Sequence, residues 1–321
     1  KPNILYIMSD DHAAHGISAY GGRLAKIAPT PNLDRLAKEG ALFKNAFCTN
    51  SICSPSRACV LTGQYNHVNG AVDLGGRVEP GKQMLAIEMG KAGYVTAMIG
   101  KWHLKGNPTD EFQHWEILSG KGGQGSYFNP TFLSAQGESQ VTGHSARIIT
   151  DKALDWLKNR DPEKPFLLCA QYKTPHIHRL PPPNRMGGYD DHEFPVPETF
   201  FDDFSTRSSF VSKTWMALKG MKGHVLNIAP TEEEIRKNPK IRPPFLQEMT
   251  PRQRKAWHTA YDPRNLKFRK MKEAGKLEGK RAQLYVYQRF IKDYVRCIDG
   301  LDDQIGRILS FLDESGLTKN T

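Results

Sequence analysis

The residues Cys53 to Gly63, CSPSRACVLTG, combine side chains that could carry out chemistry with an apolar run that looks like the first turns of a helix. A cysteine at a helix N-terminus lies in a positive field, which favours an anion or a thiolate. Arg57 follows about one helical turn later, and a guanidinium can bind an anion through two parallel hydrogen bonds. Because a lone buried cysteine is ordinarily a small hydrophobic residue, it is this pairing that indicates an anion site.

Other candidate residues follow short apolar runs that predict buried strands of a parallel sheet. These runs are residues 3–9, 94–100 and 166–172. Functional residues gather at the carboxyl ends of the strands in such sheets. The side chains that come just after the predicted strands are Asp10, Asp11, Lys101, His103 and His176.

These residue types suit a metal-assisted anion site. Two adjacent carboxylates, Asp10 and Asp11, form a plausible half-site for Ca²⁺ or Mg²⁺, which prefer oxygen ligands, although such a pair also occurs in solvated turns. Lys101 and His103 flank Trp102. If the segment is extended, alternation directs both side chains to the same face.

The alternation of strands with helices predicts an α/β fold with a mostly parallel central sheet and helices on both faces. Helices are expected at 30–40, 82–92 and 144–160, and a further strand-like run at 41–48. A long helical stretch is expected from 280 to 315, broken near Gly300. Residues 179–279 contain clustered prolines and little periodicity, which predicts a partly irregular insertion with a few short helices.

Composition sets the class of protein. The 321 residues suffice for one large α/β domain or two medium ones, and no window approaches the roughly 18 apolar residues of a membrane span. The five cysteines form no disulfide framework or CxxC metal site, and Cys48, Cys59, Cys169 and Cys297 are interpreted as buried structural thiols. No signal peptide precedes the first strand, and the first residue is Lys, so we expect that an upstream segment was removed.

The net charge of +11 is concentrated in one segment. Residues 236–281 hold 15 Lys and Arg against 4 Asp and Glu, which leaves the rest of the chain close to neutral. Such a segment favours a polyanionic partner such as nucleic acid, an anionic surface or a sulfated glycan, and a solvated surface insertion is an equally good interpretation. No recognisable nucleic-acid-binding motif accompanies the charge, so nucleic acid is not expected.

Taken together, the motifs resemble one known family. The run from Cys53 to Gly63 is similar to the signature C-x-P-S-R-x-x-x-L-T-G of the type I sulfatases, members of the alkaline-phosphatase-like superfamily, without departure. PNILYIMSDD, GKWHL at 100–104 and KTPHIH also resemble segments of that family. The chain looks closest to bacterial glycan sulfatases of the N-acetylglucosamine-6-sulfatase type.

The resemblance implies a sulfuric ester hydrolase (EC 3.1.6.-) that acts on a sulfated saccharide. In this family the signature cysteine, here Cys53, is oxidised to Cα-formylglycine by a formylglycine-generating or sulfatase-maturing enzyme that recognises the Pro and the Arg. One hydroxyl of the aldehyde hydrate attacks sulfur and forms a covalent sulfate ester. The second hydroxyl lets that intermediate collapse to the aldehyde and expel sulfate.

The resemblance also implies a role for each matched residue. Asp10 and Asp11, with the modified Cys53, would bind Ca²⁺ acting as a Lewis acid. Arg57 would hold the hydrate, and Lys101 would bind sulfate oxygens. The remaining roles concern three histidines. His103 would accept a proton during collapse, His176 would help to protonate the leaving alcohol, and His178 would contact the sugar.

One part of the family pattern has no match. Sulfatases complete the metal site with an Asp followed by Asn, Gln or His on a later strand, and a second active-site Lys follows it. Asp302-Asp303-Gln304 lies in a predicted helix and is interpreted as its polar face. We therefore expect residues 1–321 to be an incomplete N-terminal catalytic domain, with a basic, Pro-rich insertion at 180–280 and without the C-terminal subdomain. Alone, it should be inactive.

Two other functions stay open at this point. One is a phosphoester or phosphonate hydrolase of the same superfamily, which the ratio of phosphatase to sulfatase activity would separate. The other is a catalytically silent binder of polyanions that uses residues 236–281, whose binding would depend steeply on salt and would survive Cys53→Ala. For the leading interpretation, a periplasmic or secreted location is expected.

Overall fold

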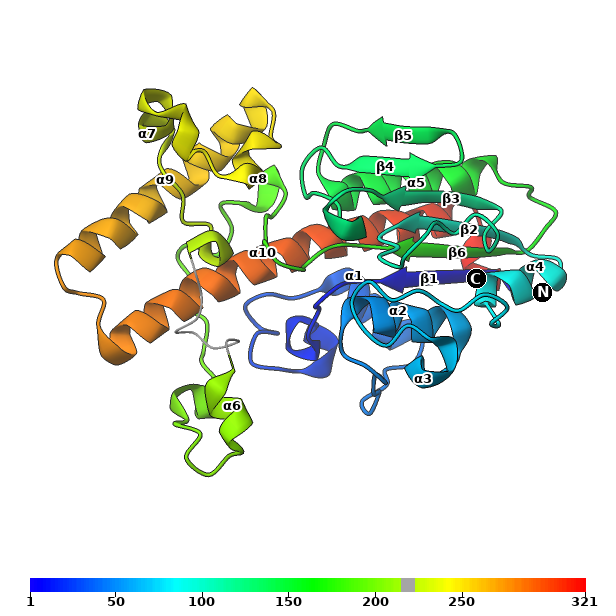
Figure 1. Ribbon diagram of the computed structural model, residues 1–321, viewed down its shortest axis with the longest axis horizontal. Coiled ribbons are helices and arrows are strands. Elements are labelled where there is room, and N and C mark those ends of the chain that lie inside the picture. The colour runs from blue at the N-terminus through cyan, green and yellow to red at the C-terminus, as the bar shows by residue number, and fades with distance from the viewer. Residues whose placement is uncertain (215–222) are drawn as a thin grey trace. The chain divides into compact units, whose positions relative to one another are not determined.

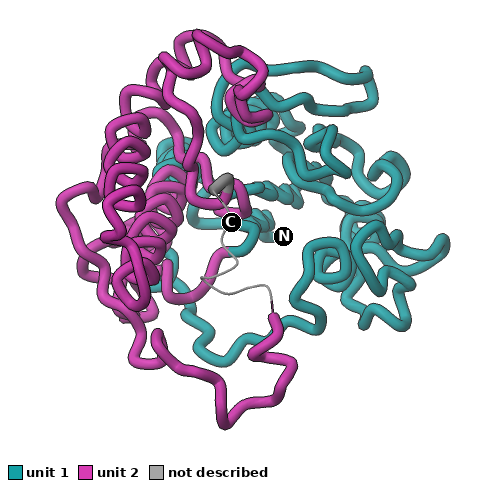
Figure 2. Tube along the Cα trace, turned by 60° about the vertical axis from the view of Figure 1, so that its left-hand side comes forward, with its two compact units in different colours: residues 1–11, 36–174, 303–321 teal, residues 12–35, 175–302 magenta. Residues whose placement is uncertain are grey.

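The computed structural model describes residues 1–214 and 223–321, which divide into two compact units (Figure 2). Unit 1 comprises residues 1–11, 36–174 and 303–321, and unit 2 comprises residues 12–35 and 175–302. The predicted insertion at 180–280 belongs to unit 2, except for its residues 215–222, which lie outside the described part of the chain.

Unit 1 is built on a six-stranded sheet (Figure 1). In space the strands follow the order β1-β6-β2-β3-β4-β5. The first four are parallel to one another, and β4 and β5 add an antiparallel edge. The strands are β1 (Ile4–Met8), β2 (Val95–Gly100), β3 (His114–Leu118), β4 (Thr131–Ser134), β5 (Gly137–Gln140) and β6 (Phe166–Gln171).

The helices assigned among the described residues range from one turn to ten. They are α1 (Pro31–Glu39), α2 (Cys53–Thr62), α3 (Asn66–Asn69), α4 (Leu85–Lys91), α5 (Ser145–Asn159), α6 (Ser209–Lys213), α7 (Glu232–Lys237), α8 (Pro244–Gln247), α9 (Pro251–Glu273) and α10 (Gly279–Glu314). Residues 279–302 of α10 belong to unit 2 and the rest to unit 1.

Helices cover both faces of the sheet, which confirms the predicted α/β class. One face packs under α2 and α4 through an apolar cluster that includes Leu61, Met98 and Leu167. On the other face, the Tyr172 and Thr150 hydroxyls lie 2.7 Å apart and join the end of β6 to α5. Because consecutive strand residues point to opposite faces, β6 is buried along its whole length.

The sequence predicted three neighbouring parallel strands of the sheet and missed the other three. Runs 3–9, 94–100 and 166–172 correspond to β1, β2 and β6, whereas β3, β4 and β5 were not predicted. The strand expected at 41–48 is wrong: that run forms no strand, and Phe43 and Phe47 are 73% and 91% exposed. Cys48 is also exposed, contrary to the expectation of a buried thiol.

Unit 2 is held together by an apolar cluster and a buried ion pair. Its cluster joins Leu24 and Phe194 to a stripe of α10 that includes Ile291 and Ile298. Below that stripe, Arg296 and Asp293 form a salt bridge at 2.7 Å with both side chains 3% exposed. A paired charge of this kind is tolerated in a core because each partner satisfies the other.

Helix α9 corrects the expectation that residues 179–279 contain only short helices. It runs for 23 residues and starts with a capping box in which Thr250 and Gln253 bond reciprocally to each other's backbone. Pro251 stands at its first position, where the missing N–H costs nothing. Pro263 lies inside the helix, although an interior proline removes one backbone hydrogen bond and ordinarily kinks a helix.

Helix α10 is continuous through Gly300, so the expected break is wrong. A Cβ atom built on Gly300 would lie 2.6 Å from Cγ of Pro182. Gly300 is therefore present because another segment of unit 2 packs against the bare backbone, and it does not interrupt the helix.

This close contact predicts opposite effects for alanine at two helical glycines. Gly300→Ala should destabilise the protein by about 1–3 kcal/mol, because the added methyl group overpacks Pro182. Gly90→Ala in α4 is the matched control, since nothing lies within 4 Å of its added Cβ. That change should stabilise by roughly 0.5–1 kcal/mol through helix propensity. Urea unfolding of both variants tests this, and stabilisation by Gly300→Ala would contradict it.

A second prediction concerns Glu234, which closes the capping box of α7 and accepts from Arg269 at 2.7 Å. The hydrogen bond from Arg269, followed by that from the Thr231 backbone, lowers the pKa of Glu234 from 4.5 to about 2. A lowered pKa in the folded state stabilises the protein above pH 4.5, and this stabilisation is lost as the pH falls toward 2. The carboxylate is 45% exposed, so solvent screening keeps the effect small.

We therefore expect Glu234→Gln to lower the free energy of unfolding by about 0.5–1 kcal/mol at pH 7 and to have almost no effect near pH 2. Unfolding by urea at several pH values measures the difference. Glu233→Gln, which removes an exposed pair with Lys237, is the control and should cost less. A Glu234→Gln penalty that is equal at both pH values would exclude the ionic explanation.

Candidate functional site

Cys53 is the first residue of α2, as the sequence predicted. Ile52 precedes the helix in an extended conformation, and Gly63 ends it in the left-handed region with its N–H donating to the carbonyl of Cys59. The hydroxyl of Ser54 donates to the His103 carbonyl at 2.7 Å. This bond fixes the start of the helix against the loop that follows β2.

Gly100 determines the backbone position of Lys101 at the end of β2. Its φ of +109° is strained for any residue with a side chain, and an added Cβ would lie 2.0 Å from the carbonyl oxygen of Gln171. This close approach lets the Lys101 N–H donate to the same carbonyl at 2.7 Å. The side chain of Lys101 is consequently fully buried at the carboxyl end of β2.

The Asp10 carboxylate joins two buried cations. The backbone N–H of Asp10 donates to the carbonyl of Thr174 at 3.1 Å, and this bond holds the end of β1 beside the end of β6. Lys101 Nζ donates to Asp10 Oδ2, and a guanidinium nitrogen of Arg57 lies 3.5 Å from the same oxygen. Both cations are fully buried, and Asp10 is 6% exposed.

Two glutamines complete the partners of these cations. Arg57 donates from one nitrogen to Oε1 of Gln171 and to the Lys101 carbonyl at 2.5 Å. Lys101 Nζ donates to Oε1 of Gln124 at 2.6 Å. No sequence pattern points to Gln124 or Gln171, because neither amide stands in a motif with distinctive spacing.

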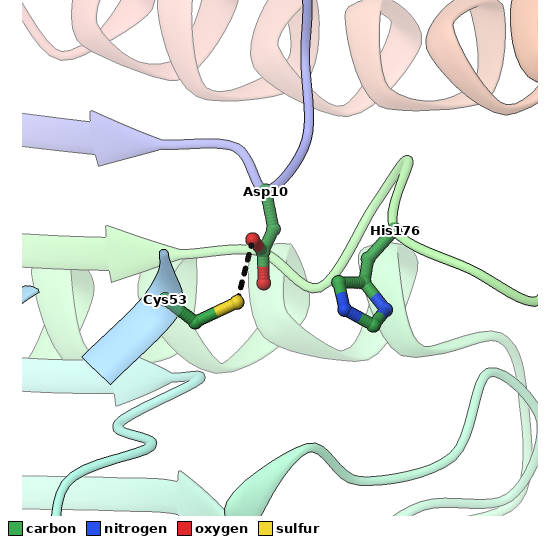
Figure 3. Close-up of side chains that lie close together, drawn as sticks. All are labelled: Asp10, Cys53 and His176. Atoms are coloured by element: carbon green, nitrogen blue, oxygen red, sulfur yellow. Dashed lines mark hydrogen bonds between the residues drawn. The ribbon is translucent and has the colours of Figure 1, made fainter. Parts of the chain in front are cut away.

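The Cys53 thiol points at the carboxylate (Figure 3). Its Sγ lies 3.6 Å from Asp10 Oδ1 and 3.7 Å from Lys101 Nζ. Burial and then the charge of Asp10 raise the pKa of Cys53, against the opposing effect of Lys101. Burial and the Asp10 charge therefore act against the thiolate that the helix N-terminus is expected to favour, and the raised pKa keeps the unmodified side chain a thiol.

His103 lies at the site in a conformation that the sequence did not predict. Its φ is +53°, so the segment is not extended and the alternation argument for Lys101 and His103 fails. Trp102 between them is buried, and its indole N–H donates to the Gly106 carbonyl at 3.1 Å. His103 itself is half-buried.

The remaining candidates lie on two loops. Asp11 is exposed and has a φ of +58°. His176 and His178 are half-buried and follow β6, in the first residues of unit 2. His176 Nδ1 lies 2.6 Å from the Ile177 carbonyl oxygen, and the ring lies close to Asp10 and Cys53 in Figure 3.

The donor set fits a hard cation in kind. Carboxylate oxygens of Asp10 and Asp11 are the ligands that Ca²⁺ prefers, whereas a thiol is a soft ligand that suits it poorly. Asp10 Oδ1 faces Cys53, while Oδ2 is held by the two cations. A metal ion here would therefore share the Asp10 carboxylate with Lys101 and Arg57.

Fold and site define a class: an α/β protein with a cysteine, a carboxylate and buried cations at the carboxyl ends of parallel strands. The sulfatase family profile matches residues 2–321, and the chain belongs to that family. It is 36% identical over 323 residues to an N-acetylglucosamine-6-O-sulfatase of Bacteroides thetaiotaomicron, covering 100% of this chain and 56% of that protein. An N-acetylgalactosamine-6-sulfatase of Homo sapiens is 30% identical over 219 residues.

 This alignment spans 54% of this chain and 40% of the human protein.

Solved structures agree with this assignment. A structure described as a complex with its substrate D-glucosamine-2-N,6-O-disulfate superposes with a TM-score of 0.93 at 36% identity, covering all of this chain and 64% of that one. A phosphonate monoester hydrolase from Silicibacter pomeroyi shares the fold, with a TM-score of 0.58 at 19% identity. The chain thus covers 56% of the Bacteroides thetaiotaomicron protein and 64% of the chain in the complex with the disulfated sugar.

Among the residues that the structure describes, no helix has the length and apolar character needed to cross a membrane.

The shared carboxylate predicts unequal effects for the two adjacent aspartates. Asp10→Asn removes the negative charge that Arg57 and Lys101 contact, so two buried cations lose their counter-charge. We expect a loss of about 3 kcal/mol or more in the free energy of unfolding, measured in EDTA so that no metal contributes. Asp11→Asn, at an exposed position, is the control and should change stability by less than about 0.5 kcal/mol. Equal effects would exclude the proposed role of Asp10.

Proposed function

We propose that this protein is a sulfuric ester hydrolase that removes sulfate from a sulfated sugar. The observation that carries the proposal is the position of Cys53 beside Asp10 and Lys101, with Arg57 buried behind them. Membership of the sulfatase family supports it. An anionic sulfate group would enter a site whose walls are already lined with fixed positive charge, which requires little reorganisation during reaction.

The neutral thiol of Cys53 favours a modified nucleophile. The sulfatase family is generally dependent on formylglycine and on a metal, and we propose conversion of Cys53 to Cα-formylglycine by a maturation enzyme. The converted side chain supplies hydroxyl groups in place of a thiol, and hydroxyl oxygens are also acceptable ligands for Ca²⁺. Arg57 and Lys101 would then hold position 53 and the sulfate oxygens by charge.

Asp10 and Asp11 would hold the Ca²⁺ ion, which would supply Lewis-acid polarisation of the sulfate. Within the chain itself, Asp10 keeps Lys101 and Arg57 in place, and Lys101 reaches the nucleophile. We propose His103 as the acceptor of the proton lost from position 53, and His176 as the donor to the leaving alcohol. His178 would contact the sugar.

For the substrate, we propose a 6-O-sulfated N-acetylglucosamine or glucosamine unit of a glycan. The support is the name of the Bacteroides thetaiotaomicron relative and the sugar in the most similar of the structures compared above. We also propose that residues 1–321 form the N-terminal part of the catalytic domain, with 180–280 inserted in it, and that the protein acts in the periplasm or outside the cell.

The test uses the full-length protein, produced with and without a maturation enzyme. We expect sulfate release from 6-O-sulfated N-acetylglucosamine only when a peptide map shows the aldehyde at position 53. Cys53→Ala should reduce kcat by several orders of magnitude, because no nucleophile remains. Cys48→Ala, at an exposed cysteine, is the control and should keep full activity.

Two results would contradict the proposal. Sulfate release that survives Cys53→Ala would exclude Cys53 as the nucleophile. A higher kcat/KM for phosphate or phosphonate esters than for any sulfate ester would instead favour the phosphoester hydrolase. Salt-sensitive glycan binding without any hydrolysis would favour the polyanion binder.

A further inference from the structure

Lys173 is a buried lysine at the end of β6 whose role the site description leaves open. Lys173 is only 6% exposed. In the described part of the chain, the ammonium group of Lys173 lies over the Tyr127 ring, with Nζ 5.5 Å from the ring centroid. The same group has no hydrogen-bond or carboxylate partner among those residues.

Unsatisfied donors gather at this strand end. Gln171 stands two residues earlier, and its Oε1 accepts a hydrogen bond from Arg57. The buried Nε2 of Gln171 has no hydrogen-bond partner among the described residues. The buried hydroxyl of Thr174 also has no hydrogen-bond partner among those residues. Buried polar groups are ordinarily hydrogen-bonded, so a set of unpaired donors at one place requires an explanation.

The charges around Lys173 show where it lies. Burial, and then the nearby charge of Lys101, lower its pKa to about 8, while Asp10 acts in the opposite direction. Lys173 therefore lies within electrostatic range of the same carboxylate and lysine that contact Cys53. Lys173 stands two residues after Gln171, whose side chain contacts Arg57, and residues two apart along an extended strand point to the same side.

We propose that Lys173 is a sulfate-binding residue that, together with the amide of Gln171, holds the anionic group of the substrate at the end of β6. This inference rests on the proposed function. Arg57, Lys101 and Lys173 are three buried cations, and Asp10 is the buried carboxylate that the first two contact. Burying the third charge without a counter-ion is costly for folding, and a bound sulfate would supply the missing negative charge.

The thermal stability of Lys173 variants distinguishes a ligand-binding role of this lysine from a structural one. If Lys173 serves the ligand, Lys173→Met should keep or raise the thermal unfolding midpoint, because the variant no longer buries an unpaired charge. The same variant should weaken the binding of inorganic sulfate at least about tenfold, since a charge-assisted hydrogen bond is lost. Lys173→Arg keeps the charge and should recover part of that affinity.

The experiment uses the full-length protein with Cys53 converted. Sulfate binding is measured by calorimetry, the midpoint by thermal unfolding, and kcat/KM on 6-O-sulfated N-acetylglucosamine. Lys121→Met is the matched control: it removes one positive charge at an exposed position that also acts on Lys173. Its sulfate affinity should stay within about twofold of the wild type, as expected for a screened surface charge.

The outcomes distinguish this inference from the proposed function. Weaker sulfate binding in Lys173→Met with an unchanged or higher midpoint supports the role of Lys173, even if the wild type hydrolyses no sulfate ester. Unchanged sulfate affinity would overturn it, even if the enzyme is an active sulfatase. A lower midpoint in both Lys173→Met and Lys173→Arg, without recovery of sulfate binding in Lys173→Arg, would show a structural role and would also overturn it.

Discussion

The contact on which the site depends is the Asp10 carboxylate shared by Lys101 and Arg57. Both cations are fully buried, and a buried charge is stable only when it is paired and hydrogen-bonded. The carboxylate also faces the Cys53 thiol through its other oxygen. The ends of β1 and β2, and the first turns of α2, are therefore tied together by one side chain, which is itself positioned by a backbone bond to the end of β6.

This arrangement explains which parts of the site could be predicted from the sequence. Cys53 and Arg57 stand in one short motif with fixed spacing, and Asp10 comes just after an apolar run that forms β1. The conformation of His103 could not be predicted, because it depends on the turn that Gly100 starts through its close approach to Gln171. Gln124, Gln171 and Lys173 were missed because their roles arise from tertiary contacts and not from local pattern.

The fold shows the same division. The strands β1, β2 and β6 have apolar runs that leave little choice of structure, whereas β5 is exposed along its whole length and carries no apolar pattern. Glycine and proline misled the prediction in opposite ways. Gly300 indicated a break in α10 but accommodates Pro182, so there the tertiary context outweighs the local propensity. The clustered prolines of residues 179–279 argued against a long helix, but Pro251 and the capping box at Thr250 start α9.

The burial of α2 has a consequence for the order of events in the life of the chain. Pro55 and Arg57 are buried, and the thiol of Cys53 is half-buried and neutral. An enzyme that recognises the cysteine together with the proline and the arginine needs all three within its own binding cleft. The folded chain hides two of them, so any such modification has to take place while this segment is still an unfolded peptide, and a chain that folds first would keep its thiol permanently.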